Sequence, residues 1–265
     1  MADENNPNNA TKDDGMTRRD FIKNGSMVAG GVVGGTFLGG LLGRQFWGTQ
    51  DTAQETDTQT DDDQAHDHAP ANDYTEARMF FKRQEDFRVL SAAVERIFPE
   101  DDLGPGAITL GVPYYIDKQL AGSYGRNARE YMQGPFAEGA VTQGFQSGMY
   151  RQDIFLQGIR RMQSISRNNF NEAFFDLEEE HQINILIEFE EGNVDMNGIR
   201  SAEFFNMLRT VTLEGVYADP VYGGNRNMDG WRLKQYPGGQ MAYIDMIEED
   251  DFVEMEPVSL HDHHS

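Results

Sequence analysis

Apolar residues recur at helical spacing in several stretches between residues 77 and 240. In residues 84–98 they lie mostly three or four positions apart, which places them on one face of a helix: Phe87, Leu90, Val94, Ile97 and Phe98. The same spacing predicts further helices over about 109–120, 150–166, 177–191 and 202–213. Asp176 and Ser201 precede the last two and are expected to be their N-caps. No alternating apolar and polar stretch of strand length appears, so the pattern predicts an all-α fold.

Glycine and proline separate these helical stretches. Pro99 is expected to end the first helix, and Pro113 is expected in the first turn of the second, where the missing N–H is tolerated. Residues 122–148 are rich in glycine and are predicted to form a long loop with one or two helical turns. The sequence therefore predicts a single compact helical domain at 77–240 with long loops rich in Gly and Pro.

The formal charge of −23 is distributed unevenly along the chain. Residues 51–76 contribute −9 and residues 241–265 contribute −8, whereas the longer stretch 77–240 contributes −6. Acidic segments with few aromatic residues do not bury enough apolar surface to become ordered. We therefore expect a polar disordered N-terminus (1–16), an acidic disordered linker (48–76) and an acidic disordered tail (241–265). The negative charge also argues against a nucleic-acid partner.

Residues 17–47 have the pattern of a twin-arginine export signal. Thr-Arg-Arg-Asp-Phe-Ile-Lys at 17–23 is followed by a glycine-containing apolar run from Met27 to Leu42. The twin-arginine translocase is therefore an expected partner. We expect the chain at the outer face of the cytoplasmic membrane, or in the periplasm or another extracytoplasmic space. The signal residues are Arg18, Arg19, Phe21 and Lys23.

The apolar run has two interpretations. No small-x-small cleavage site follows Leu42, and Phe46 and Trp47 suit a membrane interface. Residues 27–47 also approach the roughly 20 residues that a helix needs to cross a bilayer. The segment either remains as an N-terminal membrane anchor or is cleaved at a poor site, and the sequence leaves both open.

The sequence carries no recognisable catalytic or cofactor motif. It has no cysteine, which excludes disulfides, thiolate metal sites, iron–sulfur clusters and covalent c-type haem on this chain. It also lacks a Gly-x-Gly-x-x-Gly turn, a phosphate-binding Gly-Lys-Ser/Thr and a Gly-x-Ser-x-Gly nucleophile. We therefore expect no catalytic, cofactor-binding or metal-binding residue in the domain.

Residues 214–239 are a different kind of segment. They combine glycines, prolines and aromatic residues directly after an amphipathic helix and cannot form a regular element. Asp219-Pro220 favours an extended or turn backbone, and Gly223-Gly224-Asn225 tolerates positive φ. Two interpretations are compatible: a loop packed on its own domain, or a loop that faces a partner. The expected interface residues are Tyr222, Gly223, Gly224, Asn225 and Trp231. If the loop is internal, residues 105–117 are the alternative interface.

Three blocks of residues resemble a known family. The first is the helix ending in Ile-Phe-Pro at 97–99, and the second comprises Asp-Asp-Leu-Gly-Pro-Gly-Ala at 101–107 and Leu-Gly-Val-Pro-Tyr-Tyr-Ile-Asp at 110–117. The third is Glu-Gly-x-Tyr-x-Asp-Pro-x-Tyr-Gly-Gly-Asn at 214–225, followed by Gly-Trp at 230–231 and Tyr-Pro-Gly at 236–238. Together they are similar to subunit 3, the small subunit, of gluconate 2-dehydrogenase. The likeness covers about residues 80–239, and the acidic linker and tail depart from it.

This resemblance implies a non-catalytic accessory subunit. Members of the family pair with a large FAD-containing subunit of the glucose–methanol–choline type, which oxidises an alcohol, sugar or sugar acid and passes electrons to a cytochrome or quinone rather than to NAD. The small subunit is then expected to supply the export signal and to stabilise the flavoprotein, with FAD in the partner and no cofactor on this chain. The alternative is a stand-alone exported, membrane-tethered binding or stress protein with the same fold.

Overall fold

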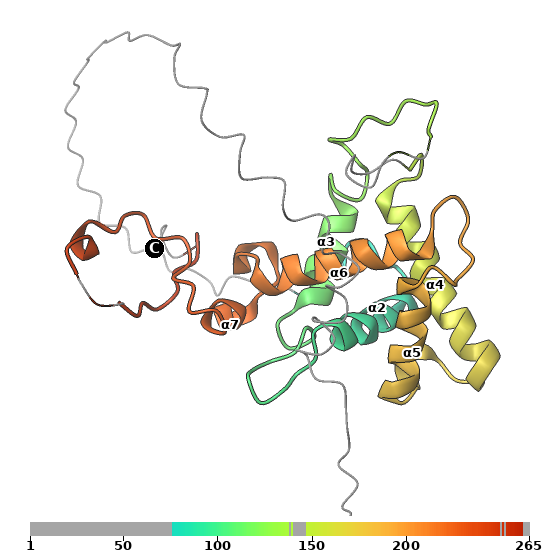
Figure 1. Cartoon of the computed structure of the whole chain (residues 1–265), viewed down its shortest axis with the longest axis horizontal. Helices are drawn as coiled ribbons and strands as arrows, with labels where there is room; N and C mark the ends of the chain where they lie inside the picture. Colours follow the sequence, from blue (N-terminus) through green and yellow to red (C-terminus); the bar gives the residue numbers. More distant parts are fainter. Residues whose placement is uncertain (1–75, 138, 140–146, 250, 252, 262–265) are drawn as a thin grey trace, which may run out of the picture.

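The computed structural model describes residues 76–137, 139, 147–249, 251 and 253–261 of the 265-residue chain (Figure 1). Within them lie five α-helices of ten or more residues: α2 (Gln84–Ile97), α3 (Val112–Ala121), α4 (Arg151–Phe170), α5 (Glu179–Glu190) and α6 (Ser201–Tyr217). A short helix, α7 (Asp229–Arg232), follows α6. No strand occurs in this part of the chain, so the predicted all-α fold is confirmed.

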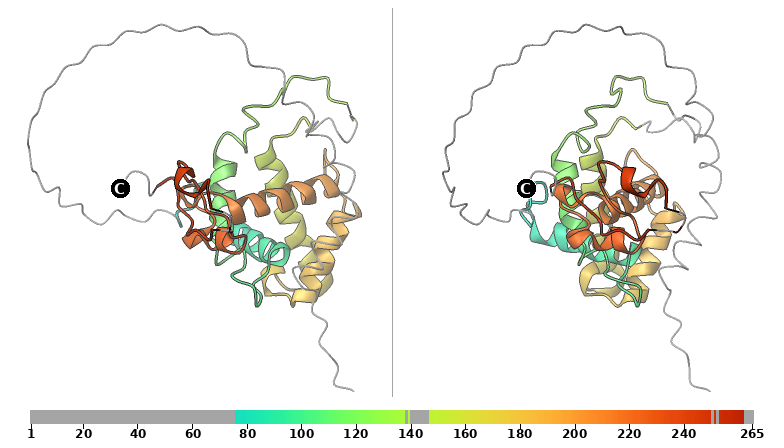
Figure 2. Two further views of the ribbon diagram at one scale, coloured as in Figure 1. Left: turned by 60° about the vertical axis from the view of Figure 1, so that its left-hand side comes forward. Right: turned by 90° about the vertical axis from the view of Figure 1, so that its left-hand side faces the viewer.

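Helix α6 is the centre of the domain. It contacts α2, α3, α4 and α5, and Figures 1 and 2 show it leading to α7 and to the C-terminal segment, which projects from one end. The ring of Phe204 in α6 lies edge-on to Phe155 of α4 and Phe189 of α5, with centroids 5.7 and 5.5 Å away. Gly158 of α4 leaves room for this ring, because a Cβ there would be 2.3 Å from Phe204 Cζ. Three helices thus meet at one aromatic side chain.

Proline and glycine set the boundaries of the first two helices as predicted. Helix α2 ends at Ile97, two residues before Pro99, and α3 begins with Pro113 in its first turn. Gly111 precedes α3 with a φ of 76°, a left-handed conformation that glycine adopts without strain. In the loop predicted after α3, residues 122–137 form turns and no α-helix.

The predicted N-caps of α5 and α6 are wrong. Glu178 and Arg200 occupy the two cap positions, and neither makes a side-chain cap hydrogen bond. Asp176 instead lies in the 3-10 turn η2 (Phe174–Asp176), and its carboxylate accepts a hydrogen bond from Arg88 of α2 at 3.3 Å. The chain makes this turn before α5 because Phe174 is fully buried, which moves the start of the helix beyond Asp176.

A buried carboxylate joins the start of the domain to α3. Asp117 is fully buried, and its two oxygens accept hydrogen bonds from the consecutive backbone N–H groups of Met79, Phe80 and Phe81. The bond from Phe81 to Oδ1 is 2.8 Å long. Burial of a carboxylate is tolerated when it accepts several hydrogen bonds. Asp117 therefore fixes the point at which the chain enters the domain.

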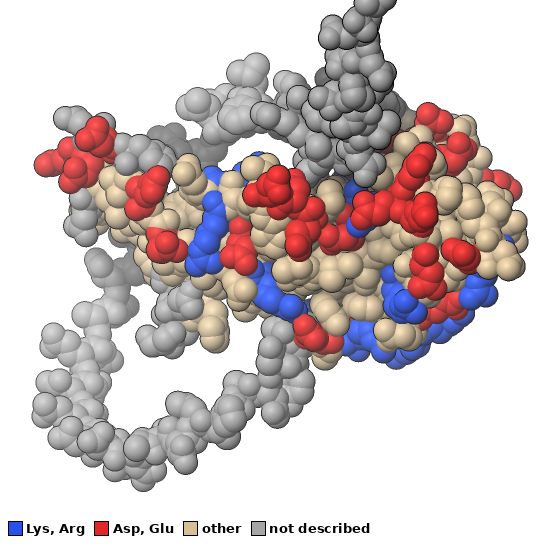
Figure 3. Space-filling model, turned by 90° about the horizontal axis from the view of Figure 1, so that it is seen from below, with Lys and Arg blue, Asp and Glu red and all other residues tan. Residues whose placement is uncertain are grey.

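Charged side chains of both signs lie on the surface. The face in Figure 3 shows Asp and Glu over most of its length, including the C-terminal end at the left, while Lys and Arg gather along one edge at the other end. Ion pairs between such exposed side chains contribute only about 0–1 kcal/mol each to stability. The fold therefore depends on its apolar core and on the buried polar contacts.

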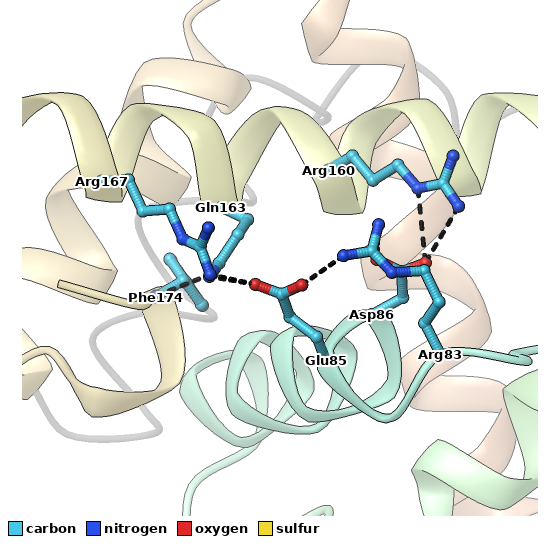
Figure 4. A network of polar contacts seen from close by, with 7 residues as sticks. All are labelled: Arg83, Glu85, Asp86, Arg160, Gln163, Arg167 and Phe174. Carbon is cyan, nitrogen blue, oxygen red and sulfur yellow. Dashed lines mark hydrogen bonds and ion pairs between the residues drawn. The ribbon is translucent and has the colours of Figure 1, made fainter.

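One such polar network ties α2 to α4 (Figure 4). The Gln163 side chain donates to Glu85 Oε1 at 2.9 Å and accepts the N–H of Phe174 at 2.9 Å. Asp86 is almost completely buried and accepts a hydrogen bond from Arg160 at 3.1 Å. Because Gln163 of α4 hydrogen-bonds both to α2 and to the turn η2, it fixes these three segments relative to one another.

The predicted N-terminus, export signal, anchor and all but the last residue of the acidic linker lie outside the described residues. This applies to Arg18, Arg19, Phe21 and Lys23 and to the apolar run 27–47. Within the described ranges, no helix is both long enough and apolar enough to span a membrane.

Candidate functional site: the loop after helix α6

The loop predicted from residue 214 begins inside α6 and leaves the helix after Tyr217. It continues through the 3-10 turns η3 (Pro220–Tyr222) and η4 (Arg226–Met228) into α7. Asp219 caps the first turn, because its Oδ1 accepts the N–H of Val221 at 3.0 Å, and Pro220 occupies the first position of that turn. The Asp-Pro pair therefore ends α6 and sets the direction of the loop.

The side chain of Asn225 holds the loop together through hydrogen bonds inside it. Its side chain is fully buried, with Nδ2 donating to the carbonyl oxygen of Ala218 at 2.8 Å and Oδ1 accepting the N–H of Gly230 at 2.8 Å. Its backbone is left-handed, with a φ of 45°, which asparagine tolerates better than most residues. One side chain thus joins the start of the loop to α7.

Two glycines let the loop lie directly on the backbone of α6. A Cβ on Gly224 would be 2.2 Å from the carbonyl oxygen of Gly215, and one on Gly230 would be 2.1 Å from that of Val216. Real Cβ atoms do not approach an oxygen so closely. Gly223 adds a φ of 90° at the preceding turn. The loop is therefore specified by its glycines, as the sequence predicts.

The same loop also packs against the entry to α3. The N–H of Arg226 donates to the carbonyl oxygen of Leu110 at 3.1 Å, and a Cβ on Gly111 would be 3.1 Å from the carbonyl oxygen of Gly223. Residues 110–111 and 223–226 are far apart in sequence, yet they form one contact. The second and third blocks that carry the family resemblance therefore meet in space.

Trp231 belongs to the interior of this site. Its indole is 5% exposed, and its Nε1 donates to the carbonyl oxygen of Tyr217 at 2.8 Å. The indole packs edge-on against the ring of Tyr236, with centroids 5.4 Å apart. With Tyr217, Lys234 and Tyr236, Trp231 lines an open pocket of about 390 Å³. These side chains are aromatic or cationic.

The five predicted interface residues divide between interior and surface. Gly224, Asn225 and Trp231 are buried and Gly223 is half-buried, whereas the side chain of Tyr222 is 54% exposed. The loop is thus packed on its own domain, which is the first of the two interpretations. Tyr222 and the equally exposed Val221 face solvent, as does Tyr236 further along the loop. The contact of Tyr222 with a partner stays a prediction.

Titratable groups near the loop have pKa values shifted by burial. Burial raises the pKa of Tyr115 to about 12, with a smaller contribution from Glu214. Burial also raises the pKa of Tyr124 to about 12, opposed by the nearby Arg151 guanidinium. Partial desolvation raises the pKa of Glu214, again opposed by Arg151. Both phenols are therefore neutral at physiological pH.

The C-terminal segment returns to the same loop. Val258 donates its N–H to the carbonyl oxygen of Pro237 at 3.1 Å and accepts the N–H of Gly239 at 2.8 Å. Asp219 accepts hydrogen bonds from Ser259 Oγ at 2.8 Å and from the N–H of Leu260 at 2.9 Å. A disordered tail is expected from residue 241, and here the structure differs. The reason is that Val258 and Leu260 present backbone groups, and Ser259 a hydroxyl, that pair with Pro237, Gly239 and Asp219 of the loop.

Two carboxylate roles are missed by the sequence reasoning. Asp117 stands between Ile116 and Leu120 on the buried face of α3, so an acid on an apolar face is a signal for an internal contact. Asp219 also accepts hydrogen bonds from the C-terminal segment, and nothing in the sequence around it indicates this second contact. Across the described ranges, no group of three or more His, Asp or Glu side chains is placed to hold a metal ion.

The fold and the site together define a small all-α domain whose glycine-rich loop is fastened onto its central helix. Residues 84–238, more than half of the chain, match the family described as gluconate 2-dehydrogenase subunit 3. The chain therefore belongs to that family. No curated protein matches the chain, and no solved structure matches it. The matched region ends at Gly238, so it includes all but the last residue of the loop segment 214–239 and excludes residues 239–265. By its description, the family comprises accessory subunits of a dehydrogenase complex.

Proposed function

We propose that this chain is the non-catalytic small subunit of a membrane-associated, FAD-dependent alcohol or sugar-acid dehydrogenase of the glucose–methanol–choline type. It supplies twin-arginine export and stabilises the flavoprotein subunit. The observation that carries the proposal is the family match over residues 84–238. The site is compatible with it, because the buried polar side chain of Asn225 is used to hold the loop together.

In this proposal the two subunits have different functions. The partner binds FAD and carries out the oxidation, and electrons leave it for a cytochrome or quinone rather than for NAD. This chain carries Arg18 and Arg19 for the translocase, and the partner is exported with it as a folded complex. The apolar run 27–47 holds the complex at the outer face of the membrane if the signal is retained.

The proposal is tested by expressing the full chain together with a candidate FAD-containing large subunit of the glucose–methanol–choline type from the same organism. We expect the two to co-purify through a tag on the large subunit, and both to be found outside the cytoplasm. Replacing Arg18 and Arg19 together by Lys should leave both subunits, still associated, in the cytoplasm. Cell fractionation with a flavin absorbance measurement on each fraction reports this result.

Two outcomes contradict the proposal. Normal export of the double-Lys variant would show that residues 17–23 are not the signal. A wild-type chain that is exported but never co-purifies with a flavoprotein would favour the stand-alone membrane-tethered binding or stress protein. A double variant of exposed arginines elsewhere, Arg88→Lys with Arg161→Lys, is the matched control and should be exported normally.

A further inference from the structure

The residues beyond the family match form a closed projection. We call the described part of residues 239–256 the C-terminal lobe; it projects from the domain beyond α7 (Figure 1). Its base is closed by the pairing of Val258 with residues 237 and 239 and by the hydrogen bonds from Ser259 and Leu260 to Asp219. Gly238 is required at this base, because its φ is 75° and a Cβ would be 2.3 Å from the carbonyl oxygen of Val258. The lobe is therefore held at both ends.

The lobe presents large apolar side chains to solvent. Met241 is 83% exposed, Ile244 is 75% exposed, Ile247 is 74% exposed and Tyr243 is 47% exposed. These four residues, which we call the lobe surface, fall within seven consecutive positions around the 3-10 turn η5 (Ile244–Met246). Single exposed apolar residues are ordinary on a protein surface, whereas a group of them marks an interaction site.

The charge around the lobe surface is mainly negative, although Arg232 of α7 pairs with Glu256 of the lobe at 3.4 Å. Residues 241–260 contain seven Asp and Glu residues and no Lys or Arg. Glu248, Glu249 and Glu254 are exposed, and Figure 3 shows acidic side chains at this end of the molecule, with Lys or Arg beside them towards the domain. A complementary surface is therefore apolar at its centre and carries Lys and Arg around it. An anionic membrane surface or a second acidic copy of the chain would be repelled.

We propose that the lobe surface is a docking site for the large flavoprotein subunit, which binds it with an apolar patch surrounded by Lys and Arg. This inference rests on the proposed function and names the surface and the chemistry of the partner. The apolar residues form the centre of the contact, and the carboxylates form its rim. Val221 and Leu260 are also exposed, and both donate a backbone N–H to Asp219 at the base of the lobe.

The test measures binding of the full chain to the purified large subunit by calorimetry. The variant Met241→Ser/Ile244→Ser/Ile247→Ser should raise the dissociation constant about tenfold or more, as expected when residues at the centre of an interface are lost. The control Leu103→Ser/Tyr131→Ser removes equally exposed apolar side chains from other loops and should change it by less than about twofold. All the substituted side chains are exposed, so each variant should keep the wild-type melting temperature.

A second variant tests the charge. Glu248→Lys/Glu249→Lys should weaken binding at low salt and reduce the salt dependence of the dissociation constant, because rim charges act mainly through screened attraction. The control Glu172→Lys/Glu188→Lys, on other exposed positions, should leave that salt dependence unchanged. The same measurement on the wild type should show weaker binding as salt increases.

The outcomes separate this inference from the proposed function. If the wild-type chain fails to bind the flavoprotein, the proposed function is wrong and the inference falls with it. If the wild type binds and the triple variant binds equally well, the function stands and the lobe surface is not the docking site. Wild-type binding that strengthens with salt would refute the basic rim on the partner.

Discussion

Asn225→Ala tests whether the loop after α6 is held from inside. The substitution removes two hydrogen bonds, each 2.8 Å long, and leaves the N–H of Gly230 buried without its partner. Leaving a buried donor unpaired costs about 1–3 kcal/mol, and losing the bond to the half-buried carbonyl of Ala218 costs about 0.5–1.5 kcal/mol. Alanine in a left-handed backbone adds about 1–2 kcal/mol. We expect the free energy of unfolding to fall by about 2.5–6.5 kcal/mol.

Glycine at the same position separates the two causes. Asn225→Gly loses the same hydrogen bonds but has no penalty for positive φ, so it should be less destabilising than Asn225→Ala by about 1 kcal/mol. Urea unfolding of the full chain, followed by far-UV circular dichroism, measures both variants. Tyr222→Ala is the matched surface control and should stay within about 0.5 kcal/mol of wild type. An Asn225→Ala variant as stable as the control, or a glycine variant less stable than alanine, would refute the reasoning.

The remaining predictions concern export, docking, the C-terminal segment and high pH. The double-Lys variant of Arg18 and Arg19 should keep the complex in the cytoplasm, and the triple Ser variant of the lobe surface should weaken binding to the flavoprotein without lowering the melting temperature. Hydrogen exchange should show protection of the Leu260 N–H in the wild type and its loss in Asp219→Ala; equal protection in both would contradict the contact. The contribution of Tyr115 and Tyr124 to stability should be constant below pH 10 and fall towards pH 12, because the unfolded state releases their protons at the ordinary tyrosine pKa of about 10, before the folded state does. Unfolding at a series of pH values should show a smaller fall for Tyr115→Phe, and an identical fall would be inconsistent with the raised pKa of that tyrosine.

The helices could be predicted from the sequence because each buries one periodic apolar face. The first is the best case, since Phe87, Leu90 and Val94 are buried as expected and α2 ends directly before Phe98 and Pro99. The N-caps could not be predicted, because a cap depends on where the chain turns before the helix. At α5 that turn is set by the burial of Phe174, a tertiary contact that the local pattern around Asp176 does not contain.

The backbone conformation of the candidate site could be predicted from the sequence, whereas its contacts with distant residues could not. The positive φ values expected around residues 223–225 occur at Gly223 and Asn225, because local residue type limits backbone conformation. Gly224 serves instead to let the loop approach α6 closely, which depends on a neighbour distant in sequence. The docking of residues 257–260 was missed for the same reason: its acceptor, Asp219, lies about 40 residues earlier.

The carboxylate of Asp117 has a mechanical consequence. Tension applied from the N-terminal side of the domain reaches residues 79–81 before it reaches α2. Three backbone hydrogen bonds to one side chain pass that load to α3, which packs on the central helix α6. These bonds bear the load before the first turn of α2 does, so α2 is shielded from being peeled away from that turn. A pull on the preceding segment therefore acts on the middle of the fold and not on its edge.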